Sequence, residues 1–119
     1  MIPEDKELLL KDLCARLPYG VKVNLHNEIY TLLGYYDDYV MLTANVPTGQ
    51  QTNIVNIKPY LRPMSSMTED EKKVYDEYYF SAFKIAGWDM DFYNAHHLDY
   101  RGLIEMGIAL KAPEDMYES

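Results

Sequence analysis

The alternation of apolar and polar residues predicts a sheet in the first half of the chain. Residues 21–25 alternate strictly, with the two valines and the leucine on one face, as in a strand with one buried side. Further strands are predicted over 29–36, 39–44 and 52–58, separated by polar turns. The strand over 29–36 is apolar on both faces, so we expect it to be central or covered on both sides, and Gly34 within it is expected to mark a bend or bulge. Four short consecutive strands predict an antiparallel sheet that is curled or closed into a small SH3-like barrel, and an open sheet with helices on one face is the alternative.

A helix is predicted before this sheet from the spacing of apolar residues. Residues 3–17 are expected to form a helix with one apolar stripe made of Leu10, Leu13, Cys14 and Leu17. Asp12 and Arg16 fall outside that stripe, which places them away from the expected core. Cys14 falls on it, so we interpret this cysteine as a small core residue.

The segment 57–71 joins the two halves of the chain. Pro59 cannot donate a ladder hydrogen bond, so the preceding strand is expected to leave the sheet near it. Thr68 followed three residues later by Glu71 has the pattern of a capping box, which predicts the start of a helix over 69–86. Arg62 is expected to pair with an acid of 69–71.

The last third of the sequence predicts shorter helical pieces. Asp89 is expected to cap a second helix that ends near His97 or Tyr100, and glycines restrict 100–110 to a helical turn or a short third helix. The polar tail from residue 111 is expected to fray. The chain therefore predicts one α+β domain over 1–119, with a helix at 3–17, a sheet at 21–58 and a helical part at 69–110.

The charge of the chain is unevenly distributed and changes the range of expected partners. The net charge is −8, and residues 64–119 carry five bases and twelve acids, a net −7. Such a surface argues against binding to phosphate backbones, so a nucleic-acid partner is not expected. It favours a protein partner with a basic surface.

Two further observations bear on the compartment. No apolar run approaches the roughly 20 residues of a membrane helix, and the first residues lack the pattern of a signal peptide, so no membrane partner is expected. The single cysteine agrees with a reducing compartment. We therefore expect a cytoplasmic protein.

Tyrosine is unusually frequent, with twelve residues against three phenylalanines and one tryptophan. Tyrosine suits the margin of a thin core and also suits interfaces, where one side of the ring stays wet. Self-association through the tyrosines is a second route to the same composition. The candidate interaction residues are Tyr60, Arg62, Tyr75, Tyr79, Trp88 and Tyr93.

One cluster could carry chemistry: His96, His97 and Asp99. Imidazole and carboxylate groups together suit zinc, manganese or iron, and also acid–base catalysis. The simpler interpretation is structural, with a histidine packed on Tyr93 or Tyr100, Asp99 capping the next turn and Arg101 paired with an acid. The sequence holds no phosphate-binding loop, no nucleophile elbow and no Cys-x-x-Cys, and we expect no cofactor.

Three stretches resemble a known group of sequences. Lys11–Gly20, Ile57–Thr68 and Trp88–Ile104, with the ending Ala112–Tyr117, resemble a family of small uncharacterised proteins from gut Bacteroides-type bacteria and their phages or mobile elements. The resemblance implies an intracellular bacterial or phage setting, and no activity, substrate or catalytic residue.

The sequence thus favours a non-enzymatic protein–protein interaction module. The alternative is a small metal-dependent enzyme with its site around His96, His97 and Asp99. A third hypothesis, a nucleic-acid binder on the sheet face near Tyr60 and Arg62, is disfavoured by the charge.

Overall fold

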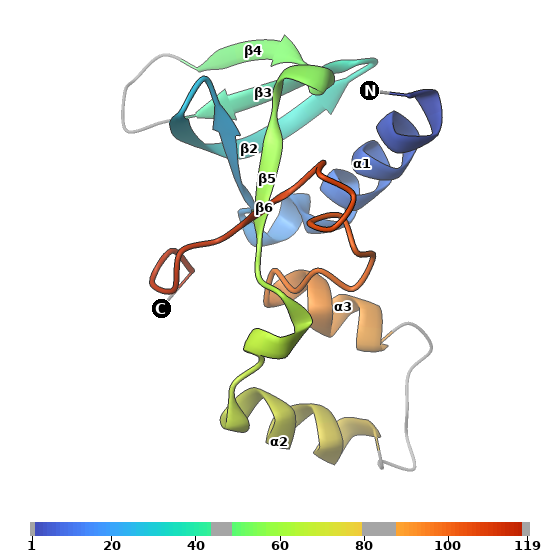
Figure 1. The fold of residues 1–119 in the computed structure, drawn as a ribbon, viewed down its shortest axis with the longest axis vertical. Helices are drawn as coiled ribbons and strands as arrows, with labels where there is room; N and C mark the ends of the chain where they lie inside the picture. The colour runs from blue at the N-terminus through green and yellow to red at the C-terminus, as the bar shows by residue number, and fades with distance from the viewer. Residues whose placement is uncertain (1, 44–48, 80–87, 118–119) are drawn as a thin grey trace.

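The computed structural model describes residues 2–43, 49–79 and 88–117. Helix α1 (Pro3–Arg16) lies along one side of a curled sheet, whereas α2 (Glu69–Tyr79) and α3 (Trp88–Ala95) extend from one end of it, with α2 farthest away (Figure 1). The predicted α+β class and the N-terminal helix are confirmed. Within these residues no helix is long and apolar enough to cross a membrane.

The described part of the chain contains one six-stranded mixed sheet in the order β4-β3-β2-β1-β5-β6. Its neighbours are antiparallel except β5 and β6, which are parallel. The predicted four strands are therefore too few, and the SH3-like barrel is not matched in detail. The strands are β1 (Lys22–Leu25), β2 (Glu28–Tyr36), β3 (Tyr39–Thr43), β4 (Gln50–Asn53), β5 (Lys58–Leu61) and β6 (Leu110–Lys111).

The strand predicted over 52–58 is broken in two. The Asn53 side chain accepts a hydrogen bond from the amide of Val55 and starts a 3₁₀ turn over Ile54–Asn56. This turn carries the chain from β4, beside β3, to β5, beside β1. The expectation that the chain leaves the sheet at Pro59 is wrong, because Pro59 lies within β5 opposite Val23. The β1–β5 ladder has only two residue pairs there, which tolerates a proline.

The two hairpins follow from backbone conformation at their turns. His26 and Asn27 have positive φ angles of 51° and 67°, and Asp37 has 51°, the left-handed geometry that tight hairpins require. In β2 the register shifts between Leu32 and Gly34, which confirms the bulge expected at this glycine. A Cβ atom on Gly34 would lie 3.0 Å from the Met41 methyl group, the flexible end of a side chain that can shift to accommodate it.

The hydrophobic core lies between α1 and one face of the sheet. From α1 the fully buried apolar residues are Leu9 and Leu13. Val21, just before β1, joins them, and the sheet contributes Val23, Leu25, Tyr30, Leu32, Val40, Leu42 and Leu61. The predicted stripe on this helix is partly wrong. Leu10, Cys14 and Leu17 are only half-buried, whereas Asp12 and Arg16 are completely buried.

The C-terminal segment also differs from expectation. Residues 110–111 form β6, Ala112 is buried, and the Tyr117 side chain reaches the sheet, so the tail does not fray over the described residues. The turn over 100–109 buries Leu103 and Ile108, as its apolar residues suggest. The predicted helical residues 80–86 lie outside the described residues.

Candidate functional site

An open cleft of about 760 Å³ lies where the start of α2, the end of α3 and the C-terminal segment meet. Arg62, Glu71, His96, His97 and Tyr117 line it, together with residues 111–114. One predicted interaction residue, Arg62, and two of the three predicted metal ligands, His96 and His97, therefore lie in the same cleft.

Arg62 and Glu71 form a bidentate ion pair across this cleft. The guanidinium Nη1 and Nη2 donate to Oε2 and Oε1 of Glu71 at 2.7 and 2.6 Å, and also to the carbonyls of His96 and Ser66. Glu71 Oε1 accepts the amide of Thr68 as well, and Thr68 Oγ1 accepts that of Glu71, so the predicted capping box is confirmed. The hydrogen bonds from Arg62, followed by those from Thr68, lower the pKa of Glu71 to about 2. The prediction that Arg62 pairs with an acid of 69–71 is confirmed.

His96 completes this polar group. Its Nδ1 lies 2.9 Å from Glu71 Oε2, and its ring packs on Phe92 with centroids 4.4 Å apart. A carboxylate at Nδ1 orients an imidazole as in general-base catalysis. The nearby Ser66 hydroxyl, however, donates to the carbonyl of Pro63 at 2.7 Å, so it is not positioned as a nucleophile. Arg62, Glu71 and His96 form a structural clamp, by which we mean that they connect α2 and the end of α3 to the end of β5.

His97 has a separate, structural environment. Its backbone is left-handed, with φ of 59°, and its ring stacks on Tyr117 at a centroid distance of 3.7 Å. Burial, followed by the positive charge of Arg16, lowers the pKa of His97 to about 4. The buried Nδ1 has no hydrogen-bond partner among the described atoms. His97 is therefore a neutral ring that packs the C-terminal segment onto the domain, with Tyr117 in the place where Tyr93 or Tyr100 was expected.

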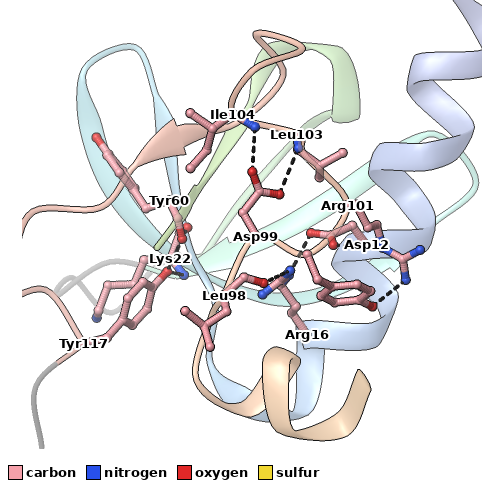
Figure 2. A network of polar contacts seen from close by, with 11 residues as sticks. Asp12, Arg16, Lys22, Tyr60, Leu98, Asp99, Arg101, Leu103, Ile104 and Tyr117 are labelled. Atoms are coloured by element: carbon pink, nitrogen blue, oxygen red, sulfur yellow. Dashed lines mark hydrogen bonds and ion pairs between the residues drawn. The ribbon is translucent and has the colours of Figure 1, made fainter. Parts of the chain in front are cut away.

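Asp99 holds the following turn in place. Its Oδ1 and Oδ2 accept the amides of Leu103 and Ile104 at 2.8 and 2.9 Å (Figure 2). The expected structural role of this residue is confirmed. Because Asp99, His97 and His96 each have different partners, the structure does not assemble the hypothetical metal site. No group of three or more ligand-type side chains is placed to hold a metal ion within 2–43, 49–79 and 88–117.

A buried charge network connects α1 to the turn after α3. Arg16 Nε donates to Asp12 Oδ2 at 2.8 Å, and Arg16 Nη2 donates to the carbonyl of Leu98 at 2.7 Å (Figure 2). Arg101 Nε reaches Asp12 Oδ1 at 3.1 Å, and Nη2 of Arg101 donates to the Tyr100 hydroxyl. Arg101 thus pairs with an acid as expected, and that acid is Asp12, which the sequence pattern had placed outside the core.

Two of the predicted aromatic residues, Tyr75 and Tyr93, contact one another. The rings of Tyr75 and Tyr93 stack at 5.7 Å, and Tyr93 stacks on Tyr100 at 5.4 Å, forming a row between α2 and the domain. Burial and the hydrogen bond to Tyr75 raise the pKa of Tyr93 to about 12. These rings hold the helices together. For Tyr79 and Trp88 only the backbone, in α2 and α3, is described.

Tyr117 is a structural residue that the sequence did not indicate. Its hydroxyl donates to the carbonyl of Tyr60 at 2.7 Å and accepts the amide of Lys22 at 2.8 Å (Figure 2). It therefore bridges β5 and β1 beyond their two-pair ladder. The Tyr60 hydroxyl accepts a hydrogen bond from the Asn24 side chain across the same strands. Nothing in the pattern of residues 111–119 predicts this contact, which depends on the fold.

An exposed apolar surface lies on the side of the sheet opposite α1. Val40 and Leu42 point into the core, so Tyr39 and Met41 point to the other side of β3. We call this surface the open face and define it by five large apolar side chains, each between 44 and 73% exposed: Ile29, Leu33, Tyr36, Tyr39 and Met41. Four of them are neighbours, because Tyr36 pairs with Tyr39 and Gly34, next to Leu33, pairs with Met41, and Ile29 lies on the same face near the start of β2.

The apolar character of residues 29–36 on both faces is the sequence signal for this surface, although the pattern alone predicts a central or doubly covered strand. Strand β2 is central, between β1 and β3, as one of the two expectations had it. Only one of its faces carries a packed layer, because α1 and the turn with Leu103 both pack on the same side, whereas the C-terminal segment only borders the other face, beside Lys22 and Ile29. An apolar strand with a single covering layer leaves its other face exposed.

Comparisons of the chain with protein-family models, curated proteins and solved structures found no match.

Proposed function

We propose that this protein is a non-enzymatic protein–protein interaction module that docks through the open face. The observation that carries the proposal is the exposure of five large apolar side chains on one face of β2 and β3, four of them neighbours. Large contiguous apolar patches are uncommon on monomeric proteins and are typical of interaction surfaces. Tyrosine and methionine are also among the residues enriched at interface cores.

The electrostatics of this face differ from those of the rest of the chain. Its described strand positions include Lys22 on β1 and Lys58 on β5 and no acid, although the chain has a net charge of −8. The register supports this assignment, since Lys22 pairs with Thr31, and Asn24 pairs with both Ile29 and Lys58. A partner can therefore cover the open face without burying an acidic side chain of these strands.

The acidic helical half remains a second candidate surface. Helix α2 exposes Glu69, Asp70, Asp76 and Glu77, which supports the prediction of a partner with a basic surface. Such contacts would be weakened by salt, whereas contacts through the open face would depend much less on it. Binding measured at low and high ionic strength therefore separates the two surfaces.

An enzymatic function has less support from the geometry. Glu71 contacts His96, but Arg62 and the capping box also engage its carboxylate. Asp99 is committed to two backbone amides, so the metal-dependent alternative lacks its third ligand. The single cysteine and the resemblance to bacterial and phage proteins support a cytoplasmic accessory role.

Site-specific photo-crosslinking tests the proposed surface. A photoreactive phenylalanine analogue replaces Tyr36 on the open face or Met106, which is as exposed as Met41 and lies in the turn after Asp99. The purified protein and a cell lysate are both irradiated. The proposal predicts protein adducts from position 36 that are absent from position 106 and are lost when Met41→Glu is added. Equal adducts at both positions, or none at position 36, would contradict it.

A further inference from the structure

The charges along the open face differ between its two ends. At one end lies Lys58, level with Ile29 through the pairings of Asn24. At the other end Tyr36 and Tyr39 flank the Asp37–Asp38 turn. With about 3.3 Å per residue, these two ends are on the order of 20 Å apart. A basic end, an apolar middle and an acidic end thus follow one another along the strands.

We infer that the open face binds a second copy of this chain, forming a face-to-face dimer in which the strands of the two sheets run antiparallel. The inference rests on the proposed function, since it names the partner of the same surface. In an isologous dimer each surface patch must complement itself. A two-fold axis perpendicular to the strands brings the Lys58 end of one copy to the Asp37 end of the other, and it places Leu33 and Met41 near the centre.

The alternative two-fold arrangement is disfavoured by the same charges. An axis parallel to the strands would place the Lys58 ends of the two copies together, and likewise the Asp37 ends. Like charges at an interface are unfavourable and act against that register. Two aligned sheets that pack with their strand directions within about 30° of one another are a common arrangement of β-sandwiches.

Neighbouring charges identify the residues to test. Asp38 forms an ion pair with Lys6 of α1 at 2.8 Å, so Asp37 is the better candidate for a contact across the interface. Asp115 of the C-terminal segment lines a hollow beside Lys22, which makes Lys58 the better base. Glu28 lies at the same end, but it pairs opposite Leu25, which faces the core, and it accepts a hydrogen bond from Tyr30.

Self-association through this face also agrees with the total charge. Two copies, each with a net charge of −8, repel one another and can associate only where their acids are sparse. The described strand positions of the open face meet that condition. The exposed acids of α2 lie on helices that extend away from the sheet, so they are kept out of the interface (Figure 1).

Sedimentation equilibrium over a range of concentrations tests the dimer. The wild type is expected to dimerise, Met41→Glu and Tyr36→Lys to be monomeric, and Met106→Glu, at an equally exposed position, to dimerise like the wild type. Circular dichroism establishes that each variant is folded. A wild type that is monomeric throughout, or folded Met41→Glu and Tyr36→Lys variants that dimerise normally, would overturn the inference. If the wild type is monomeric, photo-crosslinked adducts between position 36 and a different protein would still support the proposed function.

A charge-reversal pair tests the orientation. Lys58→Glu places an acid on the end of the face that meets the Asp37 end of the other copy, so it is expected to raise the dimer dissociation constant, by about two- to fivefold for each of the two symmetric contacts. Asp37→Asn in the same chain removes the repulsion and restores much of the affinity, and asparagine tolerates the left-handed backbone at this position. If Asp37→Asn gives no recovery in a Lys58→Glu dimer, the antiparallel arrangement is wrong.

Discussion

Arg16 donates a hydrogen bond to Asp12 from one turn further along α1, and neither side chain is exposed to solvent. Arg16 also binds the Leu98 carbonyl, and Asp12 also accepts from Arg101. The pair therefore joins the first helix to the segment after α3, more than 80 residues away in the sequence. Because both charges are buried, either one would destabilise the fold if the other were absent.

Removal of one member of this pair is expected to be severely destabilising. Asp12→Ala leaves the Arg16 charge buried with only a carbonyl partner, and it also frees Arg101. Breaking a buried ion pair costs about 3–5 kcal/mol, and we expect the free energy of unfolding to fall by that amount. Urea denaturation followed by circular dichroism measures it.

A double replacement provides the control. Asp12→Leu combined with Arg16→Met removes both charges and preserves much of the volume, so the loss should be smaller than that of Asp12→Ala. If the double variant is as unstable as the single one, the stabilising role of the pair lies in packing and not in charge compensation.

The Tyr117 hydroxyl is expected to stabilise the junction of β1 and β5. Tyr117→Phe keeps the ring on His97 but leaves the Lys22 amide and the Tyr60 carbonyl without this partner. Buried groups left unpaired cost about 1–3 kcal/mol. Hydrogen exchange should accelerate at the Lys22 amide, whereas Tyr36→Phe, at a 73% exposed position, should leave that amide unchanged. Equal exchange in both variants would show that the hydroxyl contributes nothing.

Acid should destabilise the fold through His97 first. The pKa of His97 is lowered from 6.5 to about 4 in the folded protein, so between these values the unfolded chain binds a proton that the folded chain does not. The free energy of unfolding is therefore expected to decrease as the pH falls from about 6.5 to about 4. Denaturation across this window measures the slope. In His97→Asn, which suits the left-handed backbone, that slope should largely disappear; an unchanged slope would assign it to another group.

Glu71 should act at lower pH and in a different part of the fold. Its pKa is lowered from 4.5 to about 2, so its stabilising effect is complete above about pH 4.5 and is lost as the pH falls through that range. Glu71→Gln removes the charge that Arg62 binds. Amide exchange in α2 should then increase relative to that in β2 and β3. Glu69→Gln, at a side chain that is 94% exposed, is the matched control, and similar effects of both variants would argue against a specific clamp.

Local signals in the sequence predicted the elements that depend on local chemistry. The capping box of Thr68 and Glu71, the hairpin at Asp37 and the bulge at Gly34 all depend on residues near one another in the chain. The same holds for the boundaries of α1, which were correct within one residue. For each of these, the preference of a few residues is enough to determine the geometry.

Contacts between distant segments could not be predicted in this way. Asp12 and Arg16 look like solvent-facing residues until Arg101 and Leu98 are brought beside them. Tyr117 lies in a polar tail, and its site between β1 and β5 exists only once the sheet has formed. The open face was hidden for a related reason, since the sequence shows that β2 is apolar on both sides but not how many layers cover it.

The NMR signals of the methionine methyl groups give the most direct test of the open face. Met41 and Met106 are both 44% exposed, but only Met41 lies on this surface. As the protein concentration is raised, the Met41 methyl signal is expected to shift or broaden while that of Met106 stays constant, because association covers one and not the other. Identical behaviour of the two signals at all concentrations would contradict self-association through the open face.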